Sequence, residues 1–493
     1  MANSGGDKSW STLDKDLNRI SHVEYATNYV SRPLIGLGIA LAFIVLAAVV
    51  ASVFFGSFPS NLVVVAAAGF GAYMALNIGA NDVANNMGPA VGANALTMGG
   101  AIVIAALFES AGALLAGGDV VSTISKGIID PAGFTNARVF MWAMMAALIS
   151  SALWVNIATI FGAPVSTTHS VVGGVMGAGI AAAGFTAVSW PTMGTIAASW
   201  VISPLLGGII AAAFLAFIKA KIIYQDDKIA AARRWVPVLV AIMAAAFASY
   251  LALKGLKRVV KIDISTALLI GVVIGALTYV ITAPLIRKQS EGMENRNKSL
   301  KILFGLPLVF SAALLSFAHG ANDVANAVGP LAAIVHASEF GNFAAKVAIP
   351  LWVMVIGALG ISFGLFLFGP KLIRMVGEQI TKLNPMRAYC VALSAAITVI
   401  VASWLGLPVS STHIAVGGVF GVGFFREWHA ERRLRQSAAA RPQTKRIAPE
   451  ERRRRKLVRR SHFMTIVAAW VITVPAAATM SAIIFLILNA IVS

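Results

Sequence analysis

Cysteine is almost missing from this sequence, since Cys390 is the only one among 493 residues. An internal disulfide and a cysteine-based metal site are therefore excluded. Charge is also scarce: Asp, Glu, Lys and Arg together make up 12% of the residues, against about 25% in soluble domains. With 58% hydrophobic residues and a mean hydropathy of +0.82, the composition excludes a soluble protein and predicts an integral membrane protein.

The apolar segments are continuous runs of about 18–25 residues, which suit helices across a ~30 Å hydrocarbon core better than strands of a barrel. Two regions, 138–182 and 388–425, each hold two apolar stretches joined at Gly-x-Pro, and we predict a re-entrant helical hairpin in each. We predict about nine full spans besides, at 33–57, 61–79, 99–117, 197–218, 236–253, 264–286, 302–319, 346–369 and 463–491. The expected fold class is an all-α integral membrane protein.

The basic character is local. The net charge is +19, and 14 of the 39 Lys and Arg residues lie in 426–462. A basic stretch between apolar segments usually marks a cytoplasmic loop, so this charge does not indicate nucleic-acid binding. A role of this segment in lipid-headgroup binding or regulation stays open. The N-terminal residues show no signal-peptide pattern, so no cleavable signal is expected.

An internal duplication dominates the sequence. Three pairs of segments match in order, with offsets of 241, 244 and 270 residues; the last offset is larger because the basic segment is inserted in the second copy. The pairs are GANDVANNMGPAVGA (79–93) with GANDVANAVGPLAAI (320–334), GAPVSTTHSVVGGVMGAGI (162–180) with GLPVSSTHIAVGGVFGVGF (406–424), and AASWVISPLLGGIIAAAF (197–214) with VAAWVITVPAAATMSAII (467–484).

Loop charges indicate that the two copies have opposite orientations. If 426–462 lies inside, then 219–235 and 287–301 also lie inside, and each has five Lys or Arg residues. The first-copy counterpart of the basic segment, 183–196, then lies outside and has none. Inverted-topology repeats of this kind are the architecture of alternating-access transporters. The loop 254–262 is an exception, because its four basic residues fall outside.

The predicted organisation has five parts. They are a cytoplasmic tail (1–32), an extra N-terminal span (33–57), a first inverted repeat (61–218), a central linker with two spans (219–301), and a second inverted repeat (302–491) that contains the cytoplasmic basic insert (426–462).

The duplicated Asn-Asp motif has the chemistry of a cation site. In each copy a carboxylate and nearby amides recur at i+3 and i+4 spacing, so they share one helix face. Flanking glycines and a proline predict that the helix breaks there and exposes carbonyls, which suit Na⁺ together with side-chain oxygens. Helix capping by Asp is the alternative. The predicted cation ligands are Asn81, Asp82, Asn85, Asn322, Asp323 and Asn326.

One further acid lies in a predicted span. Glu109 has Pro350 as its repeat counterpart by offset, so it breaks the symmetry of the repeats. Intramembrane carboxylates are costly and usually functional. We predict that Glu109 binds a third ion or a proton, with a structural pair to a hydroxyl or a lysine as the alternative.

The second duplicated motif, Pro-x-Ser-Ser/Thr-Thr-His, has the chemistry of an anion site. Pro164 and Pro408 can open a helix at its first turn. The hydroxyls that follow, and the free backbone N–H groups of the helix N-terminus, suit an anion. His169 and His413 are predicted to support the hairpins, with a proton relay as the alternative. The predicted anion ligands are Ser166, Thr167, Thr168, Ser410, Ser411 and Thr412.

Charge arithmetic links the two motifs. If the four motif copies converge at the midplane, two aspartates and a divalent anion would sum to about −4 in a medium of low dielectric constant, and these copies contain no Lys or Arg. Cations must therefore accompany the anion, either Na⁺ at the Asn-Asp motifs or protons on the carboxylates. The sequence predicts a cation–anion symporter with no cofactor beyond its coupling ion.

These motifs, together with FESAGALLAGGDVVSTISKGIID, make the chain resemble the inorganic phosphate transporter (PiT) family over about residues 61–490. The resemblance implies secondary transport of inorganic phosphate with Na⁺ or H⁺, inverted repeats with two hairpins, and often a homodimer. It implies that Asp82 and Asp323, with Asn81 and Asn322, serve cations and phosphate, and that the motif hydroxyls surround phosphate. The form GANDVAN resembles the Na⁺-coupled branch.

Other readings remain at this point. Some relatives of the family carry sulfate, and an ion channel with Asp rings or a membrane scaffold is a more distant alternative. An enzyme is not expected, because no nucleophile–base or metal-ligand set stands out. The expected partners are phosphate, Na⁺ or H⁺ and membrane lipids, with no nucleic acid, and the expected location is a bacterial inner membrane.

Overall fold

The structure is a computed structural model that describes residues 35–54, 61–160, 165–255, 262–340, 349–379, 384–440 and 460–492. Within these ranges the chain forms helices joined by short turns, with an isolated β-bridge between Ile129 and Val188. After the helix Ile35–Phe54, the first half contains α2 (Asn61–Gly92), α3 (Met98–Ala116), α4 (Gly118–Ser122), α5 (Ala137–Ile160), α6 (Thr167–Ala183) and α7 (Trp190–Ile218). The central and second-half helices are α8 (Lys228–Tyr250), α9 (Ile264–Gln289), α10 (Asn297–Leu303), α11 (Gly305–Phe340), α12 (Leu351–Gln379), α13 (Pro385–Trp404), α14 (Ser411–Ala440) and α16 (Arg460–Val492).

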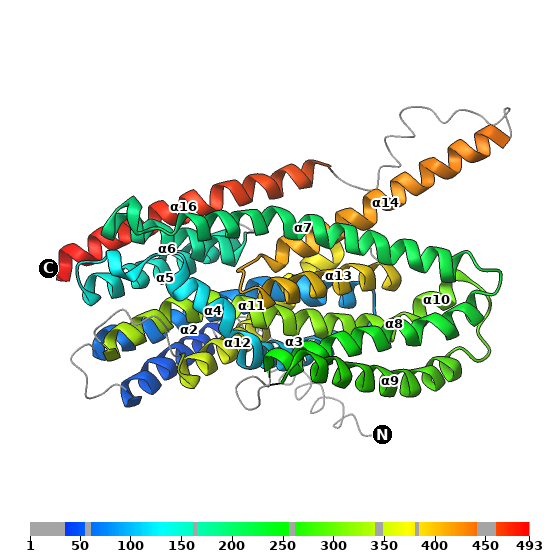
Figure 1. Cartoon of the computed structure of the whole chain (residues 1–493), viewed down its shortest axis with the longest axis horizontal. Helices are drawn as coiled ribbons and strands as arrows, with labels where there is room; N and C mark the ends of the chain where they lie inside the picture. The colour runs from blue at the N-terminus through cyan, green and yellow to red at the C-terminus, as the bar shows by residue number, and fades with distance from the viewer. Residues whose placement is uncertain are drawn as a thin grey trace, which may run out of the picture.

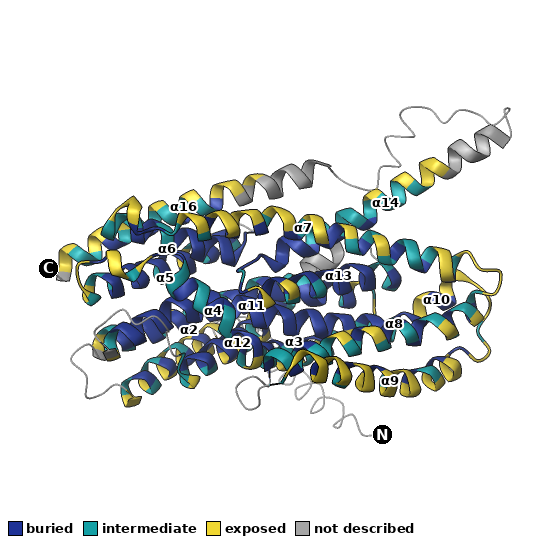
Figure 2. Ribbon diagram, in the orientation of Figure 1, coloured by how far each residue is buried: buried dark blue, intermediate teal, exposed yellow. Residues whose placement is uncertain are grey.

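Eleven of the described helices are long and apolar enough to cross a membrane. Nine of them coincide with the predicted full spans, and the other two are α5 and α13, the first arms of the predicted hairpins. Figure 2 shows that α11 is buried along nearly its whole length, whereas the outer helix α9 is largely exposed. The exposed residues of α9 are mostly leucine, valine and isoleucine, as expected where lipid covers a helix. The protein is an all-α, multi-pass membrane protein.

The predicted helix break at the Asn-Asp motifs is wrong. Helix α2 continues to Gly92 and α11 to Phe340, well past the predicted ends at 79 and 319. A Cβ added to Gly79 would lie 1.9 Å from the carbonyl oxygen of Ile361, so this glycine permits close packing of α12. Pro89 lies in the last turn of α2, where it removes only one backbone hydrogen bond. The carbonyls of these motifs therefore stay within helices.

The two halves pack reciprocally. Helix α2 packs on α12, and α11 packs on α3 in the same manner. In each pair two glycines bring the backbones together, since an added Cβ would lie within about 2 Å of the other helix's carbonyl oxygen; the contacts are Gly79 with Ile361, Gly364 with Leu76, Gly320 with Glu109, and Gly112 with Phe317. This exchange of contacts indicates a pseudo-two-fold relation between the halves.

Two serines lie on this pseudo-symmetry axis. Ser110 and Ser362 share a hydrogen bond of 2.6 Å between their hydroxyls. Each hydroxyl also approaches a carbonyl of the other helix, with Ser362 at 3.1 Å from Ala106 and Ser110 at 3.5 Å from Ala358. Both the serine numbers and the alanine numbers differ by 252, so equivalent positions of α3 and α12 meet.

The directions of the helices confirm inverted repeats. Ala75 of α2 lies beside Gly360 of α12, and Val83 lies beside Gly369, so the two helices run the same way. Helix α3 follows α2 after a short turn and runs back along it. Therefore α12 runs opposite to α3, which is its counterpart in the first repeat.

The first hairpin begins and ends at one place. The bridge between Ile129 and Val188 joins the chain before α5 to the chain after α6. Helices α5 and α6 lie side by side (Figure 1), and the Ser151 hydroxyl donates to the carbonyl of Ser170. The geometry is that of a helical hairpin; its re-entrant placement in a membrane stays a prediction. Pro164 lies outside the described residues.

Part of the predicted basic loop is helical. Helix α14 continues through Arg426 to Ala440 and extends beyond the bundle (Figure 1). Its long run of residues with good helix propensity explains the continuation. The following residues 441–459, like the predicted tail 1–32, lie outside the described residues.

One of the basic residues that conflicted with the predicted orientation has a specific partner. Lys254, in the π-helical turn Leu251–Gly255 that follows α8, forms an ion pair with Asp119 of α4. The lysine side chain is largely buried, and Asp119 compensates its charge. Lys254 therefore does not indicate on which side of the membrane the loop lies. Residues 256–261 of that loop lie outside the described residues.

A substitution at a helix crossing is expected to test this packing. A Cβ added to Gly421 of α14 would lie 2.0 Å from the carbonyl oxygen of Gly208 in α7. Gly421→Ala is expected to destabilise the protein by about 1–3 kcal/mol, because two backbones must separate. Gly194→Ala in α7 is the matched control, since nothing lies within 4 Å of its added Cβ. Thermal unfolding in detergent compares the two, and equal midpoints would contradict the close crossing.

Candidate functional site

The centre of the bundle gathers carboxylates and hydroxyls from four helices. Asp82 of α2 and Asp323 of α11 are each 1% exposed. The Thr167 hydroxyl of α6 lies 3.1 Å from Asp82 Oδ2 and 3.3 Å from Asp323 Oδ2, so it can donate to either carboxylate. The Thr412 hydroxyl of α14 donates to Asp82 Oδ1 at 3.0 Å. The four duplicated motifs therefore converge, as the sequence predicts.

Two amides orient these hydroxyls. Asn85 donates to the Thr412 hydroxyl at 2.8 Å and approaches Asp82 Oδ1 at 3.4 Å. Asn326 donates to the Thr168 hydroxyl at 3.2 Å and approaches that of Thr167 at 3.4 Å. Each amide N–H occupies a lone pair of a threonine oxygen, which directs the threonine proton away toward its own acceptor. The amides thus connect the Asn-Asp motifs to the hydroxyl motifs.

The N-termini of α6 and α14 meet beside the carboxylates. Ser166 accepts the N–H of His169, and Ser410 accepts that of His413, so both serines are helix caps. The Thr168 hydroxyl donates to the carbonyl of Val409 at 3.0 Å and links the two helix starts. Two helix N-termini direct partial positive charge to one place, which suits an anion.

The hydroxyl of Ser411 differs from its neighbours. It is buried and has no hydrogen-bond partner. A buried hydroxyl without a partner costs free energy, so it marks a position where a ligand can bind. Among the six predicted anion ligands, two serve as helix caps, namely Ser166 and Ser410. Three donate hydrogen bonds to acceptors within the protein, namely Thr167, Thr168 and Thr412. The hydroxyl of Ser411 is unpaired.

His169 and His413 lie at the contact between the two hairpins. Their ring centroids are 4.6 Å apart, and the ring of His169 lies 3.8 Å from that of Trp200 in α7. Both imidazoles are buried. The arrangement agrees with a supporting role at the hairpin contact, and their part in transport stays a prediction.

His319 is a further site residue, which the sequence patterns did not identify. Its Nε2 lies 3.3 Å from Asp323 Oδ2 and 3.8 Å from Asp82 Oδ2, and its Nδ1 lies 3.3 Å from Glu109 Oε1. The imidazole thus faces three carboxylates and is fully buried. Repeat matching does not identify it, because the first repeat has Ile78 at the matching position. A buried histidine directly before a duplicated carboxylate motif was the signal that could have identified it.

Glu109 and His319 form an asymmetric pair. The packing of α11 on α3 and of α2 on α12 matches Glu109 to Ile361, not to Pro350 as the sequence offset had suggested, because the connection before α12 is longer than that before α3. The structural equivalent of the pair is therefore Ile78 with Ile361, and both isoleucines are fully buried. One half of the site is charged where the other half is apolar.

The buried charges are mainly negative. In the described part of the chain, no Lys or Arg contacts Asp82, Glu109 or Asp323; His319 is the ionisable partner. Several buried oxygens lack hydrogen-bond partners, namely Asn86 Oδ1, Glu109 Oε2 and Asp323 Oδ1. Carboxylate and amide oxygens are hard ligands that suit alkali cations, so the site has both the charge and the donors for cation binding.

Asn81 and Asn322 have other partners. Asn81 donates to the Thr159 hydroxyl at the end of α5, at 2.9 Å. Asn322 donates to the Ser403 hydroxyl near the end of α13, at 3.0 Å. Thr159 and Ser403 are separated by 244 residues, the offset of the hydroxyl motif, so the contact is the same in both repeats.

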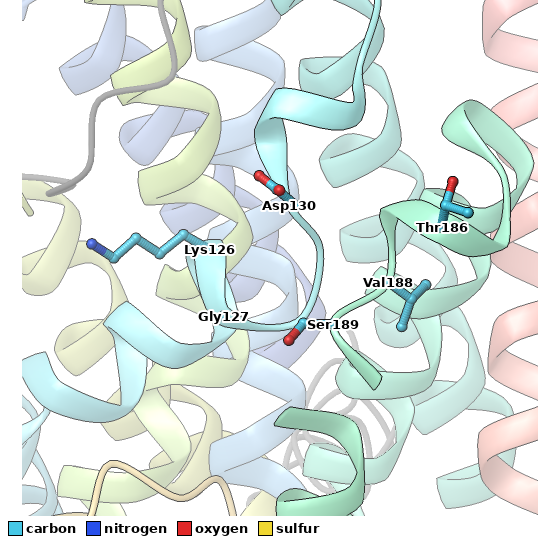
Figure 3. Close-up of a pocket in the computed structure, with 6 residues that line it drawn as sticks. All are labelled: Lys126, Gly127, Asp130, Thr186, Val188 and Ser189. Atoms are coloured by element: carbon cyan, nitrogen blue, oxygen red, sulfur yellow. The ribbon is translucent and has the colours of Figure 1, made fainter. Parts of the chain in front are cut away.

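A surface pocket of about 330 Å³ lies away from this cluster. It is found where the first hairpin meets the neighbouring turns, and Figure 3 shows Lys126 extending away from Ser189 and Thr186. Asp130 in its lining accepts the N–H of Ala132, which closes a short turn. A lysine and an aspartate of opposite charge do not make an anion site, so the pocket does not compete with the central cluster.

Inverted helical repeats around a buried polar centre are the architecture of alternating-access membrane transporters. The profile of the "Phosphate transporter family" matches residues 78–481. The chain belongs to the phosphate transporter family.

Relatives agree over most of the chain. The chain is similar to a "Putative phosphate permease" of Helicobacter pylori, with 50% identity over 429 residues that cover 86% of this chain and 80% of the relative. A relative from Pyrococcus abyssi with a similar description is 36% identical over 85% of this chain and 96% of its own. A solved structure titled "The sodium-dependent phosphate transporter" matches with a TM-score of 0.79 and 35% identity, over 87% of this chain and 100% of that one.

Proposed function

We propose that the protein imports inorganic phosphate by Na⁺-coupled symport with alternating access. One observation carries the proposal: two buried carboxylates, Asp82 and Asp323, lie directly at the converging N-termini of α6 and α14. An anion at those N-termini would meet two negative charges, and cations on the carboxylates remove the repulsion. Binding of the anion and binding of the cations therefore favour each other.

The roles follow from the contacts. Cations bind at Asp82 and Asp323, with the oxygens of Asn85 and Asn326. Phosphate binds at the two helix N-termini, where it takes hydrogen bonds from the motif hydroxyls; Thr167 and Thr412 turn from the carboxylates to the anion as the cations arrive. The ligands for phosphate are Ser166, Thr167, Thr168, Ser410, Ser411 and Thr412.

The asymmetric pair, Glu109 and His319, provides a third ion-binding site. Glu109 is held by Asn86 at 2.8 Å and faces His319. A third cation or a proton binds there, and it offsets the remaining negative charge. Because the equivalent place in the other half is apolar, this third site occurs once.

Inverted repeats favour alternating access, in which the two hairpins exchange their packing around a central site. The hairpins contact each other through Thr168 and through the pair His169 and His413. These contacts break when access to the site changes from one side of the membrane to the other. We place the protein in a bacterial inner membrane with the basic insert in the cytoplasm, as a homodimer in contact with anionic lipids.

Uptake of ³²P-phosphate into proteoliposomes tests this function. An inward Na⁺ gradient is expected to drive saturable uptake, whereas a choline gradient and liposomes without protein give none. Uptake driven only by a pH gradient would mean that the coupling ion is a proton, bound at the same carboxylates, and not Na⁺. Uptake of ³⁵S-sulfate without phosphate uptake would contradict the substrate, because the same hydroxyls and amides would then hold a different oxyanion.

A further inference from the structure

The turn that precedes α14 is held by four side chains. Each carbonyl from Gly406 to Val409 accepts a hydrogen bond from a different element of the fold. The donors, in chain order of the carbonyls, are Thr123 Oγ1 at 2.7 Å, Asn322 Nδ2 at 3.1 Å, Trp200 Nε1 at 3.0 Å and Thr168 Oγ1 at 3.0 Å. A turn inside the bundle must satisfy its backbone polar groups within the protein, and this one is satisfied by residues far apart in the sequence.

Both the amide nitrogen and the amide oxygen of the Asn322 side chain form hydrogen bonds at this turn. Its amide nitrogen donates to the Ser403 hydroxyl and to the Leu407 carbonyl, and its oxygen accepts the N–H of Val409 at 3.2 Å. The residue is 1% exposed. Both N–H donors are used, and the oxygen that a cation would need already accepts a hydrogen bond.

The duplication supports a structural purpose for this contact. Asn81 donates to Thr159, which is the counterpart of Ser403 in the first repeat. By contrast, the amides of Asn85 and Asn326 donate to hydroxyls of the anion motifs. The first asparagine of each motif therefore holds a hairpin end, and the asparagine four positions later reaches the site.

We propose that Asn322 is a positioning residue for the anion-binding N-terminus of α14, and not a cation ligand. By fixing the turn at 403–409, it sets where Ser410 caps the helix and where Ser411 and Thr412 present their hydroxyls. This inference rests on the proposed function, since it assigns phosphate binding to that helix start. It differs from the role in cation binding predicted from the sequence.

Asn322→Asp separates the two roles because they predict opposite results. A carboxylate at this position would keep or strengthen a cation ligand. As a positioning residue it fails, because the carboxylate cannot donate to the Leu407 carbonyl and repels it. We expect the KM for phosphate to rise about 10-fold or more, as for loss of a buried hydrogen bond, with the half-saturating Na⁺ concentration unchanged at saturating phosphate.

Two further variants act on the same turn without touching the carboxylates. Thr123→Val and Trp200→Phe each remove one donor to the turn and preserve most of the side-chain shape. Like Asn322→Asp, both are expected to raise the KM for phosphate and to leave the half-saturating Na⁺ concentration unchanged at saturating phosphate. A lower half-saturating Na⁺ concentration in Asn322→Asp, with normal phosphate KM in all three variants, would overturn the proposal.

Amide hydrogen exchange tests the positioning without any transport. In substrate-free protein, Asn322→Asp is expected to speed exchange at Gly406 and Leu407 of the turn and at the first amides of α14, while α9 is unchanged. Unchanged exchange at the turn would overturn the inference even if the variant transports poorly. Faster exchange in a protein that carries no phosphate would instead leave the positioning intact and contradict only the proposed substrate.

Discussion

Asp82→Asn is expected to lower Na⁺-driven phosphate uptake by about 100-fold or more, since it removes the negative charge from hydrogen bonds that are worth roughly 1.5–3 kcal/mol each when charge-assisted. Asp82 accepts from Thr167 at 3.1 Å and from Thr412 at 3.0 Å. The substitution also removes one of the negative charges that bind the coupling cation. Because an asparagine can still accept from a threonine, the fold is expected to survive and the loss to be functional.

The measurement is initial uptake across a range of Na⁺ concentrations, with thermal unfolding as the check on folding. Asp323→Asn is expected to be comparably inactive, because its carboxylate contacts both Thr167 and His319. Asp130→Asn is the matched control, since Asp130 only accepts the N–H of Ala132 in a turn outside the cluster. Near-normal Na⁺-driven uptake by Asp82→Asn would contradict the cation site.

The sequence predicted the convergence of the motifs because duplication carries spatial information. Two inverted copies of a polar motif must approach each other where the repeats meet. The contacts of Thr167 with both Asp82 and Asp323 bring the two copies of the Asn-Asp motif together with a hydroxyl motif at one site. The family and the helical fold followed from the same patterns, whereas the division into full spans and re-entrant hairpins stays a prediction.

The details that failed are those that depend on packing. Gly79 resembles a helix breaker in sequence, but in the structure it lies against a carbonyl of α12. Lys254 looked like a misplaced loop charge because its partner, Asp119, is far away in the sequence. Neither a glycine's neighbour nor a lysine's partner is encoded in local periodicity.

His319 was missed for a related reason. Matching the two repeats identifies only residues that occur in both copies, and His319 has no counterpart in the first repeat. Its importance depends on three carboxylates from different helices, which only the tertiary structure brings together. Departures from internal symmetry, such as Glu109 and His319 together, therefore identify functional residues that repeat matching overlooks.

Replacing that asymmetric pair with its apolar equivalent is expected to separate stability from transport. His319→Ile alone leaves Glu109 buried with only Asn86 as a partner, and breaking such a buried pair costs about 3–5 kcal/mol. Glu109→Ile alone leaves the imidazole without that carboxylate. The double variant reproduces Ile78 and Ile361 of the other half, so its loss of stability is expected to be clearly smaller than the sum of the single losses.

Transport is expected to behave differently. The double variant lacks both the carboxylate and the imidazole that hold the third cation or proton, so uptake is expected to stay at least about 100-fold below the original protein, as for loss of about 2.7 kcal/mol of favourable interaction. Unfolding midpoints in detergent and Na⁺-driven ³²P uptake are measured on the same four proteins. If the double variant recovers stability and uptake together, the pair is only structural. If stability recovers and uptake does not, the charge on one side of the site serves the transport cycle, and the departure from symmetry gives the transporter a third binding site that its other half lacks.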